Sequence, residues 1–366
     1  MIKLMKNTFY NEKITIKKLL EFISHKEILS MSDKCSEFEK NFASYQERKY
    51  AVFFNSGSSA NLAVIQALLN LKSIKKSDRV GFSALTWATN VMPLIQLGLK
   101  AIPIDVSLKN LNVDIEQLQK LKKKLKVFFL TNLLGFCGQI DKIKEFCHKN
   151  KIILVEDNCE SLGSVYQGKK LGNFGLASTF SFFVGHHLST IEGGMVCTDN
   201  KSLYEMLVMV RAHGWSRNVT PETKINLKNK FKINDFYEKY TFYHLGYNFR
   251  PMEIQGFLGC EQLKYINEIC NKREKNFHRY QNASSNNHDF LKLDFKHMQF
   301  ISNFDYPVIC KNKNILRKYL KLFSNVEVRP IVGGSIVEQP FFKNQKKGLL
   351  EMSILLNPGI LTIVFL

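Results

Sequence analysis

Strand-like apolar segments alternate with helix-like segments between residues 49 and 199, and this alternation constrains the fold more than any other feature. Residues 58–71, 89–99 and 140–150 show the periodicity of helices. The predicted strands that flank them are 49–57, 79–85, 100–106, 127–135, 151–158, 178–183 and 193–199. Strands that alternate with helices predict a largely parallel sheet with helices on both faces. We therefore expect an α/β fold.

The pattern changes twice after the last of these strands. It becomes helical and charged after about residue 200, and mixed from about residue 250. We predict an N-terminal segment (1–30), a large domain (31–245) and a smaller C-terminal α/β domain (246–366). A chain of 366 residues is long enough for one large core and a second, smaller one.

Composition excludes several classes of protein. The start of the chain has no apolar signal-peptide core, and no stretch reaches the roughly 18 apolar residues of a membrane span, so we expect no membrane partner. The eight cysteines include no close CxxC pair, which argues against a metal site or a disulfide framework. Cysteines without such a framework are typical of the reducing cytoplasm, and we expect a cytoplasmic protein.

The net charge of +20 is compatible with nucleic-acid binding or with attraction of a smaller anionic ligand. The lysines, however, run along the whole chain instead of gathering in one segment. We expect solvated helix faces, with the lysine-rich run 120–126 on one surface helix, and no nucleic-acid partner.

Three motifs follow predicted strands, where the ligand site of such a sheet lies. The first is NSGSSAN (55–61), which joins a strand to a helix. Backbone amides at a helix N-terminus, with small residues that allow close approach, form a phosphate cradle. A tight strand-to-helix turn without a ligand uses the same residue types, so both interpretations stay open for Gly57 and Ser58.

The second motif ends the strand KIILVEDN (151–158), where Glu156 and Asp157 follow four apolar residues. A carboxylate there could hold a cationic ring nitrogen, bind a metal or cap a following helix. The third is SFFVGHHLSTIEGG (181–194), in which His186 and His187 are adjacent and should point to different sides. Two histidines beside a glycine-rich turn suggest that one has a chemical role.

Together these motifs carry a family resemblance over about residues 30–342. The order SGSSAN, FSALTWATN, TNLLG, VEDNCESLGS, LGNFG, SFF…EGG, GYNFRPMEIQGFLGCEQL and RP…QP resembles the sugar aminotransferases, which are pyridoxal-phosphate enzymes of fold type I. The resemblance implies a large α/β/α domain with a mostly parallel mixed sheet, a smaller C-terminal α/β domain, and a homodimer whose subunits share their active sites.

The resemblance also implies roles for residues at matching positions. Those implied to hold the cofactor are Gly57, Ser58 and Ser181 at its phosphate, Asn248 at the phosphate of the partner subunit's site, Trp87 on the pyridine ring and Asp157 at the ring nitrogen. A carboxylate beside that nitrogen keeps it protonated, so the ring can act as an electron sink.

Two positions depart from the family pattern. Glu160 stands where aminotransferases usually have Gln near the phenolic oxygen of the ring. His186 stands where they have the lysine that holds the cofactor covalently, and no other lysine lies in the segment 181–194. Histidine cannot hold the cofactor in this way, but it can still move a proton. The same replacement characterises the sugar 3-dehydratase subgroup.

That subgroup implies the removal of the C3 hydroxyl from a nucleotide-linked 4-keto-6-deoxyhexose, most closely GDP-4-keto-6-deoxymannose on a colitose-type deoxysugar route for surface polysaccharide. The cofactor would be non-covalent pyridoxal or pyridoxamine phosphate, with L-glutamate as amino donor. One related dehydratase adds a cysteine-bound iron–sulfur cluster, for which the cysteine spacing here offers no good match. The implied catalytic residues are His186 and His213, and Arg217, Arg250 and Arg329 are candidates for the diphosphate.

Two alternatives remain open on the sequence alone. One is a sugar aminotransferase that works without the lysine, and the other is an inactive family member that only binds or dimerises. The segment after about residue 343 does not resemble the family's usual ending, which predicts a truncated or frameshifted tail.

Overall fold

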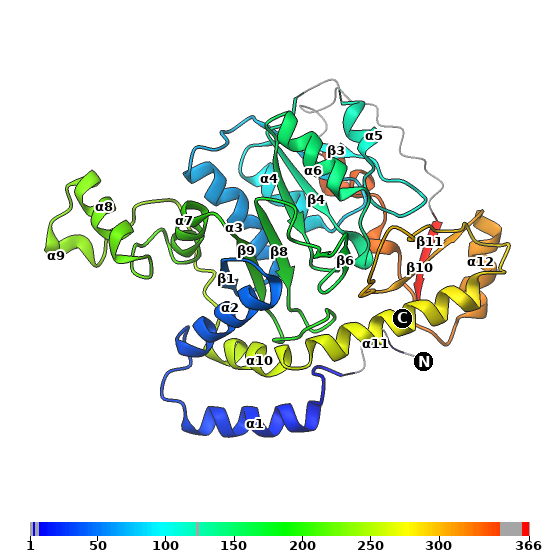
Figure 1. Ribbon diagram of the computed structural model, residues 1–366, viewed down its shortest axis with the longest axis horizontal. Coiled ribbons are helices and arrows are strands. Elements are labelled where there is room, and N and C mark those ends of the chain that lie inside the picture. The colour runs from blue at the N-terminus through cyan, green and yellow to red at the C-terminus, as the bar shows by residue number, and fades with distance from the viewer. Residues whose placement is uncertain (1–2, 4–6, 122–123, 345–360, 366) are drawn as a thin grey trace.

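A seven-stranded mixed sheet lies at the centre of the protein, which was analysed as a computed structural model that describes residues 3, 7–121, 124–344 and 361–365 (Figure 1). The strand order of this sheet is β1-β9-β8-β5-β4-β2-β3. The strands are β1 (Tyr50–Phe54), β2 (Arg79–Ser83), β3 (Lys100–Ile104), β4 (Val127–Thr131), β5 (Ile153–Asp157), β6 (Val165–Tyr166), β7 (Lys169–Lys170), β8 (Ala177–Ser181), β9 (Gly194–Thr198), β10 (Tyr306–Cys310) and β11 (Leu361–Phe365).

Helices cover this sheet and extend the chain beyond it. The α-helices are α1 (Glu12–His25), α2 (Asp33–Gln46), α3 (Gly57–Asn70), α4 (Met92–Gln96), α5 (Ile115–Gln119), α6 (Ile140–Lys149), α7 (Lys201–Arg211), α8 (Pro221–Phe231), α9 (Asp235–Glu238), α10 (Glu253–Leu263), α11 (Ile266–Ser284), α12 (Lys313–Leu322) and α13 (Pro340–Asn344). Short 3-10 turns are η1 (Ala88–Asn90), η2 (Leu133–Gly135), η3 (Ile331–Gly333) and η4 (Ile336–Glu338).

The directions of the strands bring several strand ends to one edge. Strands β3, β2, β4, β5 and β8 are parallel, and β9 is antiparallel to both β8 and β1. Strand β1 therefore runs in the same direction as β8. The carboxyl ends of β1, β2, β4, β5 and β8 meet at one edge, and the predicted, largely parallel α/β sheet is confirmed.

Side chains alternate between the two faces of the sheet, and both faces are buried. In β4, Val127 and Phe129 belong to the core cluster that includes α3 and α7, whereas Phe128 and Leu130 belong to the cluster that includes α6. A third cluster joins α2 and α10 to β1 and β8. Because both faces of such a strand are buried, nearly all of its residues are apolar, and the strand forms a continuous apolar run in the sequence.

Two local predictions need correction. The predicted helix 89–99 is divided into η1 and α4, because Pro93 lacks the amide that would continue one helix through this point. The described residues of the lysine-rich run, 120–121 and 124–126, are turn, bend or coil and not helix, because α5 ends at Gln119.

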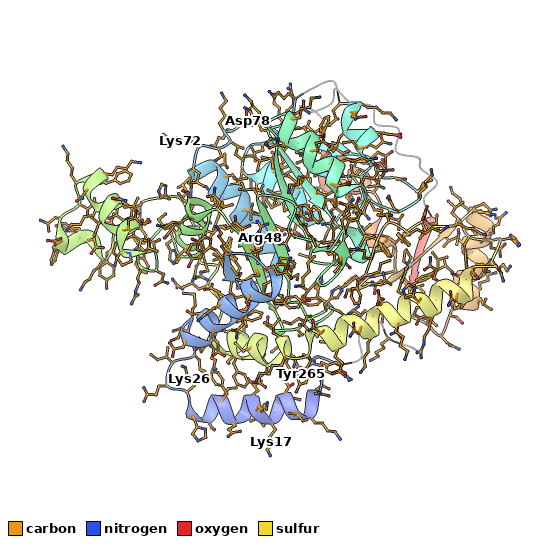
Figure 2. All side chains as sticks on the ribbon, viewed as in Figure 1. Lys17, Lys26, Arg48, Lys72, Asp78 and Tyr265 are labelled. Atoms are coloured by element: carbon orange, nitrogen blue, oxygen red, sulfur yellow. The ribbon has the colours of Figure 1, made fainter. Side chains whose placement is uncertain are left out.

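Basic side chains occupy different environments in the molecule (Figure 2). Lys17 and Lys72 are exposed at the surface, as expected for solvated lysines. The side chain of Arg48 is only 6% exposed, and its guanidinium donates to the carbonyl oxygens of Gly175 and Leu176. Arg48 therefore fixes the approach to β8 and serves the fold.

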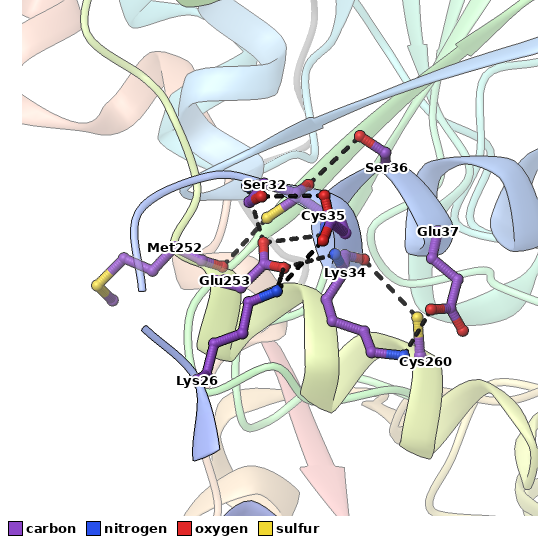
Figure 3. Close-up of polar contacts among 10 residues, drawn as sticks. Lys26, Ser32, Lys34, Cys35, Ser36, Glu37, Met252, Glu253 and Cys260 are labelled. Atoms are coloured by element: carbon purple, nitrogen blue, oxygen red, sulfur yellow. Dashed lines mark hydrogen bonds and ion pairs between the residues drawn. The ribbon is translucent and has the colours of Figure 1, made fainter. Parts of the chain in front are cut away.

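A buried carboxylate joins α10 to α2 across more than 200 residues of sequence (Figure 3). The carboxylate oxygens of Glu253 accept hydrogen bonds from the backbone N–H groups of Ser32 at 2.8 Å and Lys34 at 2.6 Å. Lys26 Nζ lies 3.5 Å from Glu253 Oε1. A negative group at a helix N-terminus satisfies amides that have no partner within the helix. Glu253, the first residue of α10, thus caps the start of α2 and ties the two helices together.

The C-terminal part of the chain contributes a small antiparallel pair, β10 with β11, beside α12. The boundary predicted at 245/246 stays a prediction, and α10 beyond it packs on α2. Residues 345–360, which hold most of the unusual tail, lie outside the described residues, so the expectation of a truncated or frameshifted ending also stays a prediction. No helix in the described part of the chain is long and apolar enough to cross a membrane.

Residues 213–250 form an arm that carries α8 and α9 away from the sheet, at the left of Figure 1. Several large aromatic side chains on this arm are exposed, among them Phe236 at 80%, Tyr240 at 74% and Phe242 at 57%. Exposed apolar groups gathered on one segment typically mark a contact surface.

Candidate functional site

A cavity of about 710 Å³ opens at the edge where the strand ends meet. Its position at the carboxyl ends of the parallel strands is the one expected for a ligand site in such a sheet. The predicted site residues that line it are Gly57, Ser58, Trp87, Asp157, Glu160, Ser181, His186 and Arg329.

The first turn of α3 forms one end of this cavity. Ser56 caps the helix, because its Oγ accepts the Ser59 amide and its carbonyl accepts the Ala60 amide. The amides of Gly57 and Ser58 have no hydrogen-bond partner within the described residues. A Cβ at position 57 would lie 2.7 Å from Ser181 Cβ, so only glycine leaves this space open. Two free amides in a tight, hydroxyl-lined turn form a cradle for an oxyanion.

Asp157 lies at the end of β5 and is 5% exposed. Its Oδ2 accepts from Asn61 Nδ2 at 3.0 Å and its Oδ1 from the Cys159 amide at 2.9 Å. These neutral donors orient the carboxylate toward the cavity without neutralising it. No described helix begins directly after β5, since β6 is the next element, so helix capping is not its role.

Trp87 presents a large aromatic surface to the cavity, with 58% of the residue exposed. It follows β2 and directly precedes η1. Thr86, the residue before it, is anchored by a 2.6 Å hydrogen bond between its hydroxyl and that of Thr131. An exposed indole on a fixed backbone can stack on a flat ring.

His186 lies in the hairpin loop that joins β8 to β9. Its Nδ1 lies 2.7 Å from the carbonyl oxygen of Cys159, which can only accept, so Nδ1 carries the proton and Nε2 is the free base. The ring packs against Phe304, with centroids 5.0 Å apart. Burial lowers the pKa of His186 to about 4, and Arg273 and Arg329 act in the same direction. The imidazole is therefore neutral and able to accept a proton at neutral pH.

His187 points away from this cavity, as the adjacency of the two histidines predicts. It is 4% exposed, and its Nε2 donates to the carbonyl oxygen of Ser302 at 2.8 Å. Burial lowers the pKa of His187 well below its usual value. This histidine ties the hairpin loop to the segment that carries Phe304.

Glu160 is half-buried in the cavity wall, where its Oε2 accepts the Leu134 amide at 2.9 Å. Burial raises the pKa of Glu160 to about 8, with a further increase from Asp305 and Asp157, against the lowering effects of the Leu134 amide and Arg329. Its carboxyl group is therefore protonated at neutral pH, unlike an ordinary surface glutamate.

An ion pair between Arg329 and Asp305 lies beside the Phe304 ring. Arg273, which sequence reasoning missed, also lines the cavity and donates to the carbonyl oxygens of Asn303 and Phe304. Arg273 lies on α11 outside every motif, so no local signal could have found it. Lys3 of the N-terminal segment lines the cavity as well.

The described residues hold no group of three or more potential metal ligands, and their cysteines are free.

Comparisons with known proteins identify the family. The sequence model of the DegT/DnrJ/EryC1/StrS aminotransferase family matches residues 11–353. The chain belongs to this family. It is 36% identical over 328 residues to a GDP-4-keto-6-deoxy-D-mannose 3-dehydratase of Yersinia pseudotuberculosis, a match that covers 87% of this chain and 81% of the relative.

Solved structures of the DegT/DnrJ/EryC1/StrS family superpose on the chain. One is a GDP-4-keto-6-deoxymannose-3-dehydratase with a trapped PLP-glutamate geminal diamine, with a TM-score of 0.86, 30% identity, and coverage of 100% of this chain and 95% of that one. A variant of such a dehydratase with bound GDP-perosamine has a TM-score of 0.81 and 32% identity. The match covers 95% of this chain and 89% of that one. The predicted fold type I is confirmed.

The cavity fits the pyridoxal phosphate of this family. The Gly57 and Ser58 amides offer an oxyanion cradle, Asp157 offers a buried carboxylate to a cationic ring nitrogen, and Trp87 offers a stacking surface. The hairpin loop offers an imidazole, His186, at the position where the family resemblance predicts a lysine.

Four predicted site residues lie apart from this cavity: His213, Arg217, Asn248 and Arg250 do not line it. His213, Arg217 and Asn248 are exposed and Arg250 is half-buried, all on or at the base of the arm. Asn248 is held by a backbone bridge to Ala212. The roles predicted for these four residues stay predictions.

Proposed function

We propose that this protein is a pyridoxal/pyridoxamine-phosphate-dependent sugar-nucleotide 3-dehydratase that acts on a 4-keto-6-deoxyhexose, with GDP-4-keto-6-deoxymannose as the substrate to test first. The observation that carries this proposal is His186, with a free Nε2, at the family's lysine position in a cavity that otherwise fits the cofactor. The dehydratase relative at 36% identity and the superposed dehydratase structures support the same reaction.

Different residues of the chain bind the cofactor and transfer the proton in this reaction. Pyridoxamine phosphate, regenerated with L-glutamate, supplies an amino group for the C4 ketone and an electron-withdrawing ring. Gly57, Ser58 and Ser181 would bind its phosphate, and Asp157 would keep the ring nitrogen cationic. His186 Nε2 would accept the proton from the cofactor carbon to which the amino group is attached, and its removal would accompany the departure of the C3 hydroxyl. Hydrolysis then releases ammonia and a 4-keto-3,6-dideoxyhexose of the colitose type, for surface polysaccharide.

The sugar nucleotide would lie at the mouth of the cavity, toward Arg329. A guanidinium matches the oxygens of a diphosphate, and Arg329 is already held in place by Asp305. We place the reaction in the cytoplasm, in keeping with the free cysteines of the described residues.

We further propose a homodimer in which the arm of one subunit completes the site of the other. The exposed aromatic residues of the arm provide an apolar contact surface, and Asn248 and Arg250 lie at its base, outside their own cavity. In this arrangement Asn248 binds the partner's cofactor phosphate, and His213 and Arg217 approach the partner's hexose and diphosphate. Mixed dimers of an Asn248→Ala chain and a His186→Asn chain should regain activity in one site of two. No recovery on mixing would contradict shared sites.

The aminotransferase alternative has one specific observation in its favour, since Lys3 lines the cavity. Borohydride reduction of the protein loaded with pyridoxal phosphate, followed by peptide mass spectrometry, separates the two functions. The dehydratase predicts no pyridoxyl adduct on Lys3 or on any residue of 181–194. An adduct at either place would favour a covalently held cofactor and transamination.

Product analysis tests the proposed function directly. Purified protein, cofactor and glutamate are incubated with a panel of 4-keto-6-deoxy sugar nucleotides, and the products are identified by mass spectrometry with an ammonia assay. A dideoxy product with released ammonia is expected. An amino sugar would indicate an aminotransferase, and the absence of any product would indicate an inactive family member.

A further inference from the structure

Residues 159 and 160 link two ionisable groups that line the same cavity, the imidazole of His186 and the carboxyl group of Glu160. The carbonyl of Cys159 holds His186 Nδ1 at 2.7 Å, which leaves Nε2 free. The next residue, Glu160, places its carboxyl group in the lining of the same cavity. A single turn of backbone therefore supports an imidazole base and a carboxyl group that face one substrate space.

The Glu160 carboxyl is held by one oxygen only. Its Oε2 accepts the Leu134 amide, and Oε1 has no hydrogen-bond partner within the described residues. Leu134 is itself fixed: it has a left-handed backbone (φ 56°), and its carbonyl accepts Asn303 Nδ2 at 2.7 Å. Gly135 follows with φ 95°, and a Cβ there would lie 2.6 Å from the Ser302 carbonyl oxygen. The amide that orients Glu160 thus belongs to a rigid turn.

The protonation states of the two groups are opposite. Burial raises the pKa of Glu160 to about 8 and lowers the pKa of His186 to about 4. Between these values one group is a protonated acid and the other a neutral base. Two titratable groups whose environments move their pKa values apart are the usual arrangement of a general acid and a general base.

We propose that Glu160 is the general acid of the dehydration and donates its proton to the departing C3 oxygen, an inference that rests on the proposed function. Hydroxide is a poor leaving group, whereas water departs readily once that oxygen is protonated. His186 would accept the C–H proton, and the electron pair of that C–H bond would replace the pair that leaves with the C3 oxygen. Glu160 supplies the second proton, and one water is released. Proton exchange with solvent then restores both residues.

A contact with the cofactor's phenolic oxygen would not by itself require an acid. A glutamine at position 160 could donate the same hydrogen bond, as the residue usual in aminotransferases does, but it could not transfer a proton. Glu160→Gln therefore keeps the size and the hydrogen-bonding capacity of the side chain while it removes the proposed function.

The test compares two leaving groups in the parent protein and in Glu160→Gln. One substrate is the 4-keto-6-deoxy sugar nucleotide turned over by the parent, and the other is its 3-deoxy-3-fluoro analogue, since fluoride departs without a full proton transfer. Glu145→Gln, an exposed carboxyl on α6, is the matched control. Cofactor affinity, and the absorbance change on reaction of the bound cofactor with glutamate, are measured in every variant as readouts that do not depend on dehydration.

For Glu160→Gln we expect a loss of roughly 10²–10³-fold in kcat with the hydroxyl substrate, the usual size of a general-acid contribution. The loss with the fluoro analogue should be less than about tenfold by the same reasoning, because protonation is no longer required. Cofactor affinity and the glutamate reaction should be unchanged. Equal losses with both leaving groups, or no loss with either, would overturn the assignment of Glu160.

The pH profile supplies a second readout. The parent rate should fall above about pH 8 as Glu160 loses its proton, and this alkaline decrease should disappear in Glu160→Gln. A profile with the same alkaline decrease in both proteins contradicts the proposal. If the parent dehydrates no sugar nucleotide, the proposed function and this inference both fail; if both proteins dehydrate equally well, only this inference fails.

Discussion

Two parts of the cavity lining, the cofactor end and the loop end, are built differently. At the cofactor end, Asp157 and Ser181 are the last residues of β5 and β8 and Gly57 is the first residue of α3, so regular structure fixes their positions. At the loop end, His186 and Glu160 lie on loops, and side-chain-to-backbone hydrogen bonds with Cys159 and Leu134 hold them.

This contrast separates cofactor binding from the choice of reaction. The strand ends cannot change without disturbing the sheet, whereas a loop residue can be replaced while its neighbours stay in place. The chain keeps an aminotransferase-like cofactor end and carries two departures, His186 and Glu160, at the other. We therefore expect changes at the first end to affect cofactor binding and electronics, and changes at the second to affect the dehydration step.

Apart from the His186 variants that test the central claim, the largest effect is expected at the cofactor end. Asp157→Asn keeps the shape of the side chain but removes the negative charge that keeps the ring nitrogen cationic. Dehydration should fall on the order of 10²–10³-fold, the size typical of removing one preorganised electrostatic contact. The measurement is kcat at saturating cofactor, beside an absorbance spectrum of the bound cofactor. An unchanged kcat would show that Asp157 does not face the ring nitrogen.

Gly57→Val should weaken cofactor binding and leave the chemical step intact. Its Cβ would lie 2.7 Å from Ser181 Cβ and close the phosphate cradle. Overpacking of this kind costs about 1–3 kcal/mol, which corresponds to a roughly tenfold to hundredfold higher Kd. Fluorescence titration with pyridoxal phosphate measures it, and Gly57→Ala should give a smaller change. Equal Kd values in all three proteins would place the phosphate elsewhere.

The smallest effect is expected in stability, at the loop end. The pKa of His187 is lowered in the folded state, so below about pH 6.5 the unfolded chain binds more protons and stability falls as pH falls. A single such group contributes about 1.4 kcal/mol per pH unit in this window. His187→Gln, which can still donate to the Ser302 carbonyl, should reduce the slope of the denaturation midpoint against pH between about pH 6.5 and 5.5, while His186 keeps its own contribution. A slope identical to the parent's would exclude His187 as the source.

The sequence predicted the cofactor end better than the loop end for the same physical reason. Strand periodicity located β1, β5 and β8, and the sheet rule then brought Gly57, Asp157 and Ser181 to one edge. The contacts of Glu160 with Leu134, and the presence of Arg273, depend on how distant loops and α11 pack. No local pattern encodes these contacts. The prediction of one helix over 89–99 was wrong because Pro93 interrupts an otherwise helical apolar pattern.

The arm shows a different limit. Family resemblance assigns Asn248 to a partner's site; it lies outside the cavity of its own chain, and the assignment stays a prediction. Sequence periodicity alone could not distinguish a residue that serves its own site from one that serves a neighbour's.

The central claim is that His186 is the base that replaced the family's lysine, and the dehydration rates of His186→Asn and His186→Lys, measured in parallel with the parent, test it most directly. Both variants should lose roughly 10²–10⁴-fold, since asparagine cannot accept the proton and a lysine bound to the cofactor is not free to do so. The lysine variant alone should form a borohydride-reducible adduct at position 186. Near-parent rates in both variants would show that His186 is not the base.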